Sequence, residues 1–524
     1  MFNNSIGKGK SINQTIGVSM ESPFAVEQPM NADEFNDEYL LKNMDLSKLP
    51  SADDKAANPF GLKTIGTVGG ICLLIGNMTG PGMVNISYQY QVGGVTLSTL
   101  AYILMMILSS FSGLFIIEAM AMIPGNPRFQ LRVEFTMLCR FFFGKWGYIA
   151  SQLFINISLQ VTNIASIIIC AQVMDSILIF FFKTTCGVSF TRGWICVHEE
   201  SPNNSPFLDE YMLFTLGFLI IIAIIVPLGF LNLDDNIVIQ IGCVIAMLII
   251  VTSWVVIFCL LGLKAENLPA FGKVSGMAQI MGNTMFNYAF VTTIPSWVNE
   301  SKPTVNINRS LWISTIGSTV IFIIIGVFGA LAFSNMSASS DILSLITTSP
   351  KSNVFFRFSV YLFPFIVLAS TIPVFSIVVR YNLVQNNFCS KKVANFFAII
   401  LPWLVTIPCL TGNWLNIISN YSSLFFNSIA NFIIPFALYI RAQKFKKNNI
   451  ISPEQRRIVE EVSKETVDWE ENETILFEDR KSFKGLKGVS KKNSVRISWI
   501  CMISFTILVL FVIFTNFYFP EESS

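Results

Sequence analysis

The stretch LLIGNMTGPG, residues 73–82, lies in the middle of a long apolar run near the start of the chain. Its last seven residues include three glycines, a proline, an asparagine and a threonine, which are poor residues for a helix interior. Pro81 has no backbone N–H, and its ring clashes with the carbonyl four residues earlier, at Asn77. In lipid, backbone groups freed in this way are tolerated only where they line a cavity or contact protein. The stretch therefore predicts a broken membrane helix with a binding site at the break.

A helix-packing face is the alternative interpretation of this stretch. Gly76 and Gly80 have the spacing of a GxxxG motif, which lets two membrane helices approach closely. This motif accounts for two glycines but not for Pro81, Gly82 and the polar residues between them. The break explains more of the stretch, so we take it as the expectation.

The composition is that of a membrane protein. Of 524 residues, 52% are hydrophobic and 13% are charged, whereas soluble domains average about 25% charged residues. The chain has one histidine, and its ten cysteines are scattered without a CxxC pair. The sequence therefore predicts no metal site, no redox centre and no cofactor. It contains no basic stripe, so nucleic acid is not an expected partner.

Crossing about 30 Å of hydrocarbon takes roughly 20 apolar residues in a helix. The sequence contains eleven such runs, which predicts an all-α polytopic membrane protein with eleven transmembrane helices. The runs cover residues 65–91, 95–117, 146–176, 211–231, 237–263, 277–298, 311–333, 354–379, 393–410, 414–440 and 497–519. The third would reach Phe182 if its helix is long and tilted. The ninth is the shortest and contains Pro402 and Pro408.

The distribution of Lys and Arg sets the expected orientation, because cytoplasmic loops carry an excess of both. Residues 441–494 hold thirteen of them, so we expect this loop and the N-terminus in the cytosol, and the C-terminus outside or in a lumen. The polar N-terminal segment lacks the apolar core of a signal peptide. The expected parts are a disordered tail 1–60, a ten-helix core 61–440, a cytosolic loop 441–494, an eleventh helix 495–519 and an outer tail 520–524.

Two features of the expected outer loops agree with this orientation. Cys186 and Cys196 share the first large outer loop, in an oxidising compartment if the topology holds. We expect a disulfide between them; the alternative is two free thiols. Asn203 and Asn335 begin N-glycosylation sequons in outer loops. A sequon also occurs inside a predicted span, at Asn85, so the two outer sequons are weak support.

A transporter built from two inverted five-helix halves would have a second broken helix in its sixth span. The halves here would be residues 61–263 and 277–440. The sixth span contains a dense polar cluster of Asn283, Asn287, Thr292 and Thr293. Its one glycine and one late proline are a weaker signal for unwinding than the first span offers. The alternative is hydrogen bonding of these side chains between helices.

Together these features resemble the amino acid/auxin permease family, within the amino acid–polyamine–organocation superfamily. Four motifs carry the resemblance, over roughly residues 60–520. They are the break Gly76–Gly82, the sixth span from Tyr288-Ala289-Phe290 through Pro295 to Glu300, the triplet Arg380-Tyr381-Asn382, and FIIPFALY at 432–439. Several animal members carry a histidine in the sixth span, whereas the single histidine here, His198, lies in an expected outer loop. This departure leaves substrate range and proton sensitivity open.

The resemblance implies a leucine-transporter-like core of five plus five inverted helices with one further helix, and a secondary transporter of small amino acids. The substrate site implied by the break and the resemblance comprises Ile75, Gly76, Asn77, Thr79, Gly80, Gly82, Phe286, Asn287, Tyr288, Ala289, Phe290 and Thr292. Thr79 and the N–H groups near Gly80 and Gly82, at the positive end of the half-helix after Pro81, are expected to hold the carboxylate. Carbonyls around Ile75 and Gly76, and those near Tyr288 and Ala289, would hold the ammonium, and the aromatic rings would surround the substrate side chain. A β-branched side chain at Gly80 is expected to block the close approach and to resist the backbone conformation.

The resemblance also implies a candidate cation site between the first-span break and hydroxyls of the eighth span. Ser370 and Thr371 are the matching residues, since a hard cation accepts neutral oxygens. The alternative for both is packing beside a kink at Pro373.

Two further polar features of the third span remain open. Asp175 could line a vestibule or reach outer water, and an ionisable residue inside a span is a functional candidate by default. Asn156, Gln160 and Asn163 share one helical face, which could look toward the substrate or toward a neighbouring helix.

The expected function is therefore transport of a small amino acid coupled to Na⁺ or H⁺, in the plasma membrane or a vacuolar or lysosomal membrane. A channel is a rival, but the repeated subunits or charged rings of channel filters are not seen. A sensor that signals through residues 441–494 is the main alternative. An enzyme is not expected, and no catalytic residue is assigned.

Overall fold

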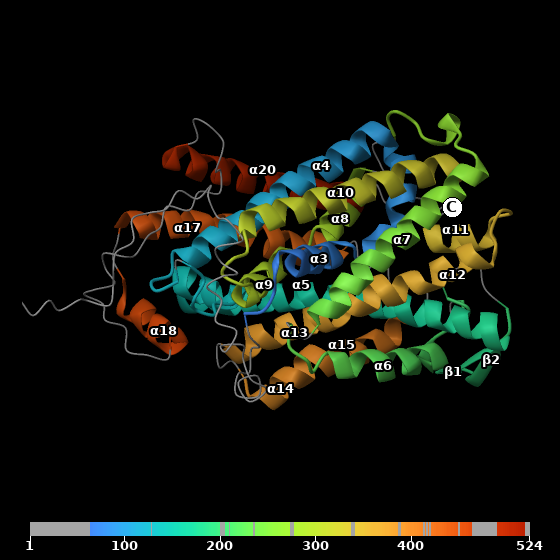
Figure 1. The fold of residues 1–524 in the computed structure, drawn as a ribbon, viewed down its shortest axis with the longest axis horizontal. Helices are drawn as coiled ribbons and strands as arrows, with labels where there is room; N and C mark the ends of the chain where they lie inside the picture. Colours follow the sequence, from blue (N-terminus) through green and yellow to red (C-terminus); the bar gives the residue numbers. More distant parts are fainter. Residues whose placement is uncertain are drawn as a thin grey trace, which may run out of the picture. The chain divides into compact units, whose positions relative to one another are not determined.

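The computed structural model describes residues 63–126, 128–199, 205–208, 210–233, 236–272, 277–336, 341–385, 389–411, 414, 418, 421–448, 451–463 and 490–518. Helices dominate these residues (Figure 1). The α-helices are α3 Thr67–Met78, α4 Ile86–Ala121, α5 Phe135–Phe182, α6 Leu216–Leu228, α7 Ile237–Leu261, α8 Met277–Asn287, α9 Ile294–Glu300, α10 Ile307–Ala332, α11 Ile342–Thr348, α12 Val354–Phe363, α13 Ala369–Gln385, α14 Lys391–Asn395, α15 Leu401–Thr406, α17 Ile434–Asn448, α18 Pro453–Ser463 and α20 Lys491–Tyr518. The 3-10 turns are η2 Pro81–Asn85, η3 Ala265–Asn267, η5 Val291–Thr293 and η8 Ile407–Cys409, and the π-helical segments are η6 Pro364–Leu368, η7 Phe396–Ile400, η9 Ser423–Asn427 and η10 Ile429–Ile433. The predicted tail 1–60 and the sequon residue Asn203 lie outside the described residues.

Eight helical stretches in the described part of the chain are long and apolar enough to cross a membrane, so the predicted count of eleven is not confirmed. They are Pro81–Ala121, Phe135–Phe182, Ile237–Leu261, Ile307–Ala332, Val354–Val384, Lys391–Cys409, Ser423–Lys447 and Lys492–Phe514. The predicted first, fourth and sixth spans lie wholly or partly in the shorter helices α3, α6, α8 and α9. Two of these spans are interrupted by breaks, and the fourth is shortened because its first residues form a β-strand.

Two glycines bend long helices where the sequence predicts loops. Gly94 (φ 75°) lies inside α4, so the end of the first predicted span and the whole second span form one bent helix. Gly144 (φ 74°) lies inside α5. Glycine adopts a positive φ without the Cβ clash of other residues. Because α5 begins before this bend, Arg140 and Lys145 lie in a helix.

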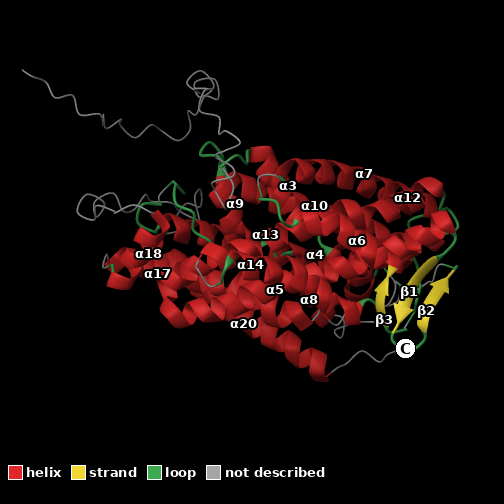
Figure 2. Ribbon diagram, turned by 90° about the horizontal axis from the view of Figure 1, so that it is seen from below, coloured by secondary structure: helices red, strands yellow, loops and turns green. Residues whose placement is uncertain are grey.

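A small antiparallel sheet corrects the all-α prediction. Its strands are β1 Thr185–Ser189, β2 Gly193–Val197 and β3 Met212–Thr215, in the order β2-β1-β3. Cys186 pairs with Cys196 in the register of β1 and β2, and a disulfide joins them. The sheet lies at one end of the helices (Figure 2).

The sheet and α18 lie at opposite ends of the helices in both ribbon views (Figures 1 and 2). α20 runs antiparallel to α17: Tyr439 donates to Ser494 near the start of α20, and the ring of Phe505 further along contacts that of Phe432. The end of α20 is therefore on the side of the sheet. This arrangement is the one expected if α18 and the sheet face opposite sides of a bilayer.

Candidate functional site

The first break occurs within the predicted stretch. Thr79 and Gly80 leave the helical conformation at the end of α3, and η2 begins at Pro81. The hydroxyl of Thr79 donates to the carbonyls of Ile75 at 2.9 Å and Gly76 at 3.3 Å. Both carbonyls, expected to accept a substrate ammonium, thus have a partner within the chain, and the hydroxyl expected to donate to the substrate carboxylate is engaged.

The sixth span is broken as well. α8 ends at Asn287, residues 288–290 form a turn, and α9 begins at Ile294 after η5. Pro295 lies in the first turn of α9, where its missing N–H leaves no helical bond unmade. The sequence left unwinding of this span open; the structure divides it into two half-helices.

The two breaks face each other. The Asn77 side chain before the first break donates to Oγ1 of Thr293 in the second at 3.0 Å. Asn283 of α8 donates to the carbonyl of Gly82 at 3.3 Å. A Cβ on Gly82 would overlap Oδ1 of Asn287 and lie 2.6 Å from Oδ1 of Asn283. A side chain at position 82 would have to displace both amides, so this close approach favours glycine.

Gly80 has different surroundings from those the sequence suggested. We expected a conformation that resists a side chain, but its φ of −93° and ψ of −165° are ordinary extended values. A Cβ at this position would meet no atom within 4 Å. The open space beside the break therefore adjoins Gly80, and the steric constraint falls on Gly82.

The aromatic rings of Tyr102, Tyr288 and Phe322 pack together at the second break. The Tyr288 ring lies 5.8 Å from that of Phe322 and 6.4 Å from that of Tyr102, measured between centroids. Its hydroxyl bonds Oγ1 of Thr319 at 2.5 Å. Phe286 and Phe290, the other predicted aromatic residues, are also buried. Tyr102 and Phe322 come from α4 and α10 and were missed, because nothing in their local sequence distinguishes them from other apolar helix residues.

Polar side chains from α5 and the π-helical segments reach the second break from another side. Thr292 donates its backbone N–H to Oδ1 of Asn431 at 3.1 Å. Asn431 in turn donates to Ser158 at 3.3 Å, and Ser158 donates to Asn427 at 2.5 Å. All four side chains are at most 1% exposed. Ser158, Asn427 and Asn431 were not predicted from the sequence.

Four buried polar atoms in this region have no hydrogen-bond partner within the described residues. They are Oδ1 of Asn77, Oδ1 of Asn287, Oγ1 of Thr292 and Nδ2 of Asn427. Each such atom costs about 1–3 kcal/mol when left unpaired. The two breaks therefore offer both acceptors and donors to a polar ligand.

The candidate cation residues lie in the first turn of α13. Ser370 donates to the carbonyl of Ile366 at 2.7 Å, and Thr371 donates to that of Leu368 at 2.9 Å. The Thr371 methyl group lies 3.9 Å from the position of a Cβ on Gly76. The end of α3 and the start of α13 therefore lie close together.

The half-helix α9 is held by the segment that precedes α5. Ser296 donates to Oε2 of Glu134 at 2.5 Å and Asn299 to Oε1 at 2.9 Å, while Asn299 accepts from the N–H of Val133 at 3.1 Å. Burial raises the pKa of the Glu134 carboxyl. Its hydrogen bonds and the charge of Arg132 lower the pKa, but by less than burial raises it. The segment just before α3 is also held to the end of α9, because the N–H of Ile65 donates to the carbonyl of Glu300 at 3.1 Å.

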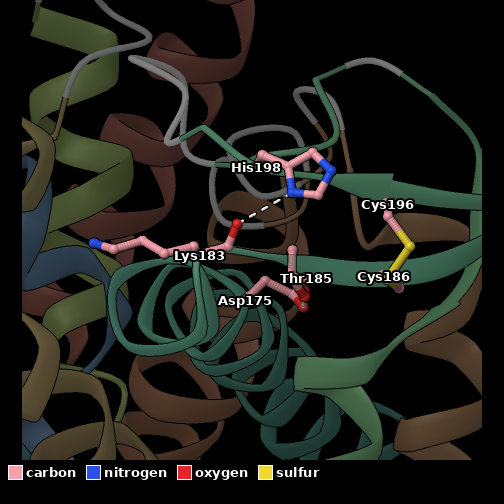
Figure 3. The surroundings of a disulfide bond; sticks show 6 residues. All are labelled: Asp175, Lys183, Thr185, Cys186, Cys196 and His198. Carbon is pink, nitrogen blue, oxygen red and sulfur yellow. Dashed lines mark hydrogen bonds between the residues drawn. A yellow bond between two sulfur atoms is a disulfide. The ribbon is translucent and has the colours of Figure 1, made fainter.

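Asp175 does neither of the things considered from sequence. It is 2% exposed, so it does not reach outer water. Its Oδ1 accepts from Thr185 of β1 at 2.7 Å and from the N–H of Gly217 in α6 at 2.9 Å. Figure 3 shows this carboxylate directed at Thr185, beside the Cys186–Cys196 disulfide. Asp175 therefore links the sheet and α6 to α5 through these hydrogen bonds.

The polar face of α5 is directed at neighbouring helices. Gln160 donates to the carbonyl of Phe397 in η7 at 2.8 Å, and Asn163 donates to Ser376 of α13 at 3.2 Å. Asn156 donates to Gln152 on its own helix at 2.7 Å. These contacts favour the packing interpretation of the face over substrate contact.

Comparison with known proteins agrees with this geometry. The sequence profile of the family described as transmembrane amino acid transporter protein matches residues 63–518. The chain belongs to this family. The resemblance to amino acid/auxin permeases is thereby confirmed, and the chain is an integral membrane protein of a transporter family. No curated protein matches the chain significantly.

Two solved structures share the fold of this family member. MhsT in complex with L-phenylalanine matches with a TM-score of 0.50 and 12% identity, over 86% of this chain and 98% of that one. Mhp1, a nucleobase-cation-symport-1 family transporter in a closed conformation with bromovinylhydantoin bound, matches with a TM-score of 0.50 and 12% identity, over 87% of this chain and 94% of that one. Both have the leucine-transporter fold, so the likeness shows that fold for the core.

Proposed function

We propose that this protein is a secondary transporter that carries small amino acids across a membrane by alternating access, driven by a Na⁺ or H⁺ gradient. The observation that carries the proposal is the pair of facing helix breaks with unpaired buried polar atoms around them. A zwitterion brings one carboxylate and one ammonium, and both need partners when water is removed. Family membership supports an amino acid as the polar ligand.

The substrate carboxylate is assigned to the start of the helix that begins at Pro81 and continues as α4. Its first N–H groups, from Gly82 onward, lie at the positive end of the helix dipole. Oδ1 of Asn77 and the carbonyls of the turn at Tyr288 and Ala289 are the acceptors for the ammonium. Ile75 and Gly76 can join them only when the Thr79 hydroxyl turns away. The open space beside Gly80 receives the substrate.

Opening toward the α18 side requires α9 to move, because α9 forms half of the site and leads toward that side. The contacts of Ser296 and Asn299 with Glu134 must then break. We infer that these hydrogen bonds between α9 and Glu134 keep one side of the transporter closed. We also infer that the side with α18 faces the cytosol. The membrane is the plasma membrane or a vacuolar or lysosomal membrane.

Uptake into proteoliposomes from a panel of labelled amino acids, with and without Na⁺ and pH gradients, tests the proposal. At least one small amino acid should accumulate above its equilibrium level when a cation gradient is imposed. No uptake of any of them by protein that is folded and inserted would contradict it.

A sensor is the second candidate, and the docking of α18 favours it. Arg140 of α5 pairs with Glu461 at 3.2 Å, Gln455 donates to the carbonyl of Phe141 at 3.0 Å, and Ile458 and Val459 are buried. A cytosolic helix held to a core helix in this way could report a change in the core. Amino acid binding without uptake in sealed vesicles would identify a sensor.

A further inference from the structure

The small sheet β2-β1-β3 has most of its polar residues inside and its apolar residues outside. On β1, the buried residues are Thr185, Gly187 and Ser189. On the other strands, Trp194 of β2 is 62% exposed and Phe214 of β3 is 36% exposed. A sheet with one face in water has the opposite pattern, with apolar residues inside. Polar residues inside and apolar residues outside are typical of strands whose outer face contacts lipid.

The strand register shows which side chains share the exposed face. Val188 of β1 lies opposite Trp194 of β2 and opposite Phe214 of β3, so these three side chains lie on one side of the sheet. We call this side the outer sheet face. None of the residues in the three strands is charged. Met212 is their one buried apolar residue, and it occupies the space that a side chain on Gly187 would fill.

The opposite face of the sheet is held to the helices by hydrogen bonds. Thr185 donates to Asp175 of α5 at 2.7 Å, and Thr215 accepts from the N–H of Phe218 in α6 at 3.1 Å. Buried polar groups need such partners, and these partners lie on the helix side. The sheet is therefore fixed with its polar face toward the helices, and the outer sheet face points away from them.

The depth of the sheet follows from the length of α6. The end of α6 far from the sheet lies beside Arg380, which donates to the carbonyl of Gly229 at 3.2 Å, and an arginine near the end of a span is expected at the membrane interface. α6 has 13 residues, which at about 1.5 Å each cover about 20 Å, whereas the hydrocarbon is about 30 Å thick. α6 begins at Leu216, directly after β3. β3 therefore lies where about 10 Å of hydrocarbon remains to be crossed.

The three strands continue outward from that depth. Figure 2 shows them in the order β3, β1, β2 going away from the helices. With about 5 Å between neighbouring strands, β2 lies about 10 Å beyond β3, at the outer boundary of the hydrocarbon. A sheet that stands in this direction presents its faces sideways, as a membrane helix does. Leu216 and Leu219 of α6 and Phe182 of α5, at the helix ends that join the sheet, are exposed as well, so the outer sheet face continues the lipid-facing surfaces of both helices.

We propose that the outer sheet face lies in the membrane interface on the side opposite α18, and that it binds phospholipid. Trp194, on the outermost strand, is then placed among the headgroups, where Trp and Tyr are enriched. Phe214, on the innermost strand, contacts acyl chains. The sheet completes the crossing that α6 begins and is not an outer loop in water. This inference goes beyond the proposed function, because it holds for any substrate.

Fluorescence of Trp194 tests the proposal. The full-length protein is reconstituted into phosphatidylcholine nanodiscs, and the emission of Trp194 is obtained as the difference between the native protein and Trp194→Phe. Lipid brominated in the upper part of its acyl chains should lower this emission about twofold or more, because the indole ring lies at that depth. Acrylamide, which quenches from the water, should have a smaller effect.

Glu266→Trp is the control. Glu266 lies in η3, after α7, and its side chain is 76% exposed. The emission that this variant adds should be quenched by acrylamide and not by brominated lipid. If Trp194→Phe does not fold, Phe214→Trp takes its place, and brominated lipid should quench the emission that it adds.

Two results overturn the inference. Quenching of Trp194 by acrylamide but not by brominated lipid would place the outer sheet face in water. Quenching by neither would mean that protein covers this face, such as a second copy of this chain. Either result for the added indole of Phe214→Trp has the same meaning. The proposed function is unaffected by both, because uptake is measured separately.

Discussion

Gly82 and Gly80 lie two residues apart in the first break, yet only Gly82 is confined by its neighbours. Gly82→Ala should lower uptake by about tenfold or more, since the added Cβ displaces Asn283 and Asn287 and moves both half-helices; misplacement of about 1 Å at a site can cost 10²-fold. Gly242→Ala in α7 is the control, because its Cβ would meet no atom within 4 Å and Gly242 lies outside both breaks. Uptake and the amount of protein in the membrane are measured for both variants. Equal activity of the two would show that the close contact at Gly82 is unimportant.

The residues that could be predicted are those whose chemistry is visible locally. Pro81 and the adjacent glycines predicted the first break, because their backbone preferences act within a few residues. The partner of a side chain could not be predicted in the same way. Thr79 was expected to donate to a substrate and instead donates to carbonyls at the end of α3. Asp175 bonds Thr185 and Gly217, and the contact with Gly217 joins parts of the chain that lie far apart in sequence.

Among the elements, the disulfide-linked sheet is the one with the clearest expected contribution to stability. The disulfide between Cys186 and Cys196 closes a loop with a sequence separation of 10 residues, a constraint worth about 3 kcal/mol. Replacing both cysteines with serine should therefore lower the apparent melting temperature. Cys259→Ser is the control, since Cys259 is a free, exposed cysteine on α7.

Labelling gives an independent check on the same bond. A thiol reagent applied to intact cells without reductant should modify neither Cys186 nor Cys196. Ready modification of either one would refute the bond.

The elements that sequence predicted well are the long apolar helices, and the ones it missed are short. The strands β1, β2 and β3 have four or five residues each, which is too few for an alternating pattern to stand out in a polar loop. The break in the sixth span was also weakly signalled. The broken span bonds Gly82 and Asn431, which lie far away in the sequence, so the local composition of the span does not reveal these contacts.

At the scale of the whole molecule, the opposite positions of α18 and the sheet make orientation testable. An epitope inserted between residues 464 and 489 should be reachable only from the cytosol. One inserted in the turn between β1 and β2, after Thr191, should be reachable only from outside or from the lumen. A tag after Ser524 should behave like the second, because α20 runs antiparallel to α17. The reverse pattern would overturn the orientation, and access to all three from one side would mean that a span is miscounted.

The number of membrane spans was the feature of the whole molecule that local sequence patterns predicted least well. Hydropathy counts apolar runs, but a run can be one helix, two half-helices or part of a bent helix. Gly94 and Gly144 lie inside bent helices, at positions where the ends of the apolar runs predicted loops. The pairing of the two breaks, by contrast, could be anticipated, because inverted repeats place the first and sixth spans at one site.

The central claim is that the protein itself carries an amino acid across the membrane, and counterflow tests this most directly. Proteoliposomes are loaded with an unlabelled amino acid at high concentration and diluted into a trace of the same amino acid in labelled form, without any ion gradient. A carrier with one site that opens alternately to each side should accumulate the label transiently above its equilibrium level. Label that only equilibrates, as through a channel, or that stays bound at the level of one site per protein, as in a sensor, would contradict the account.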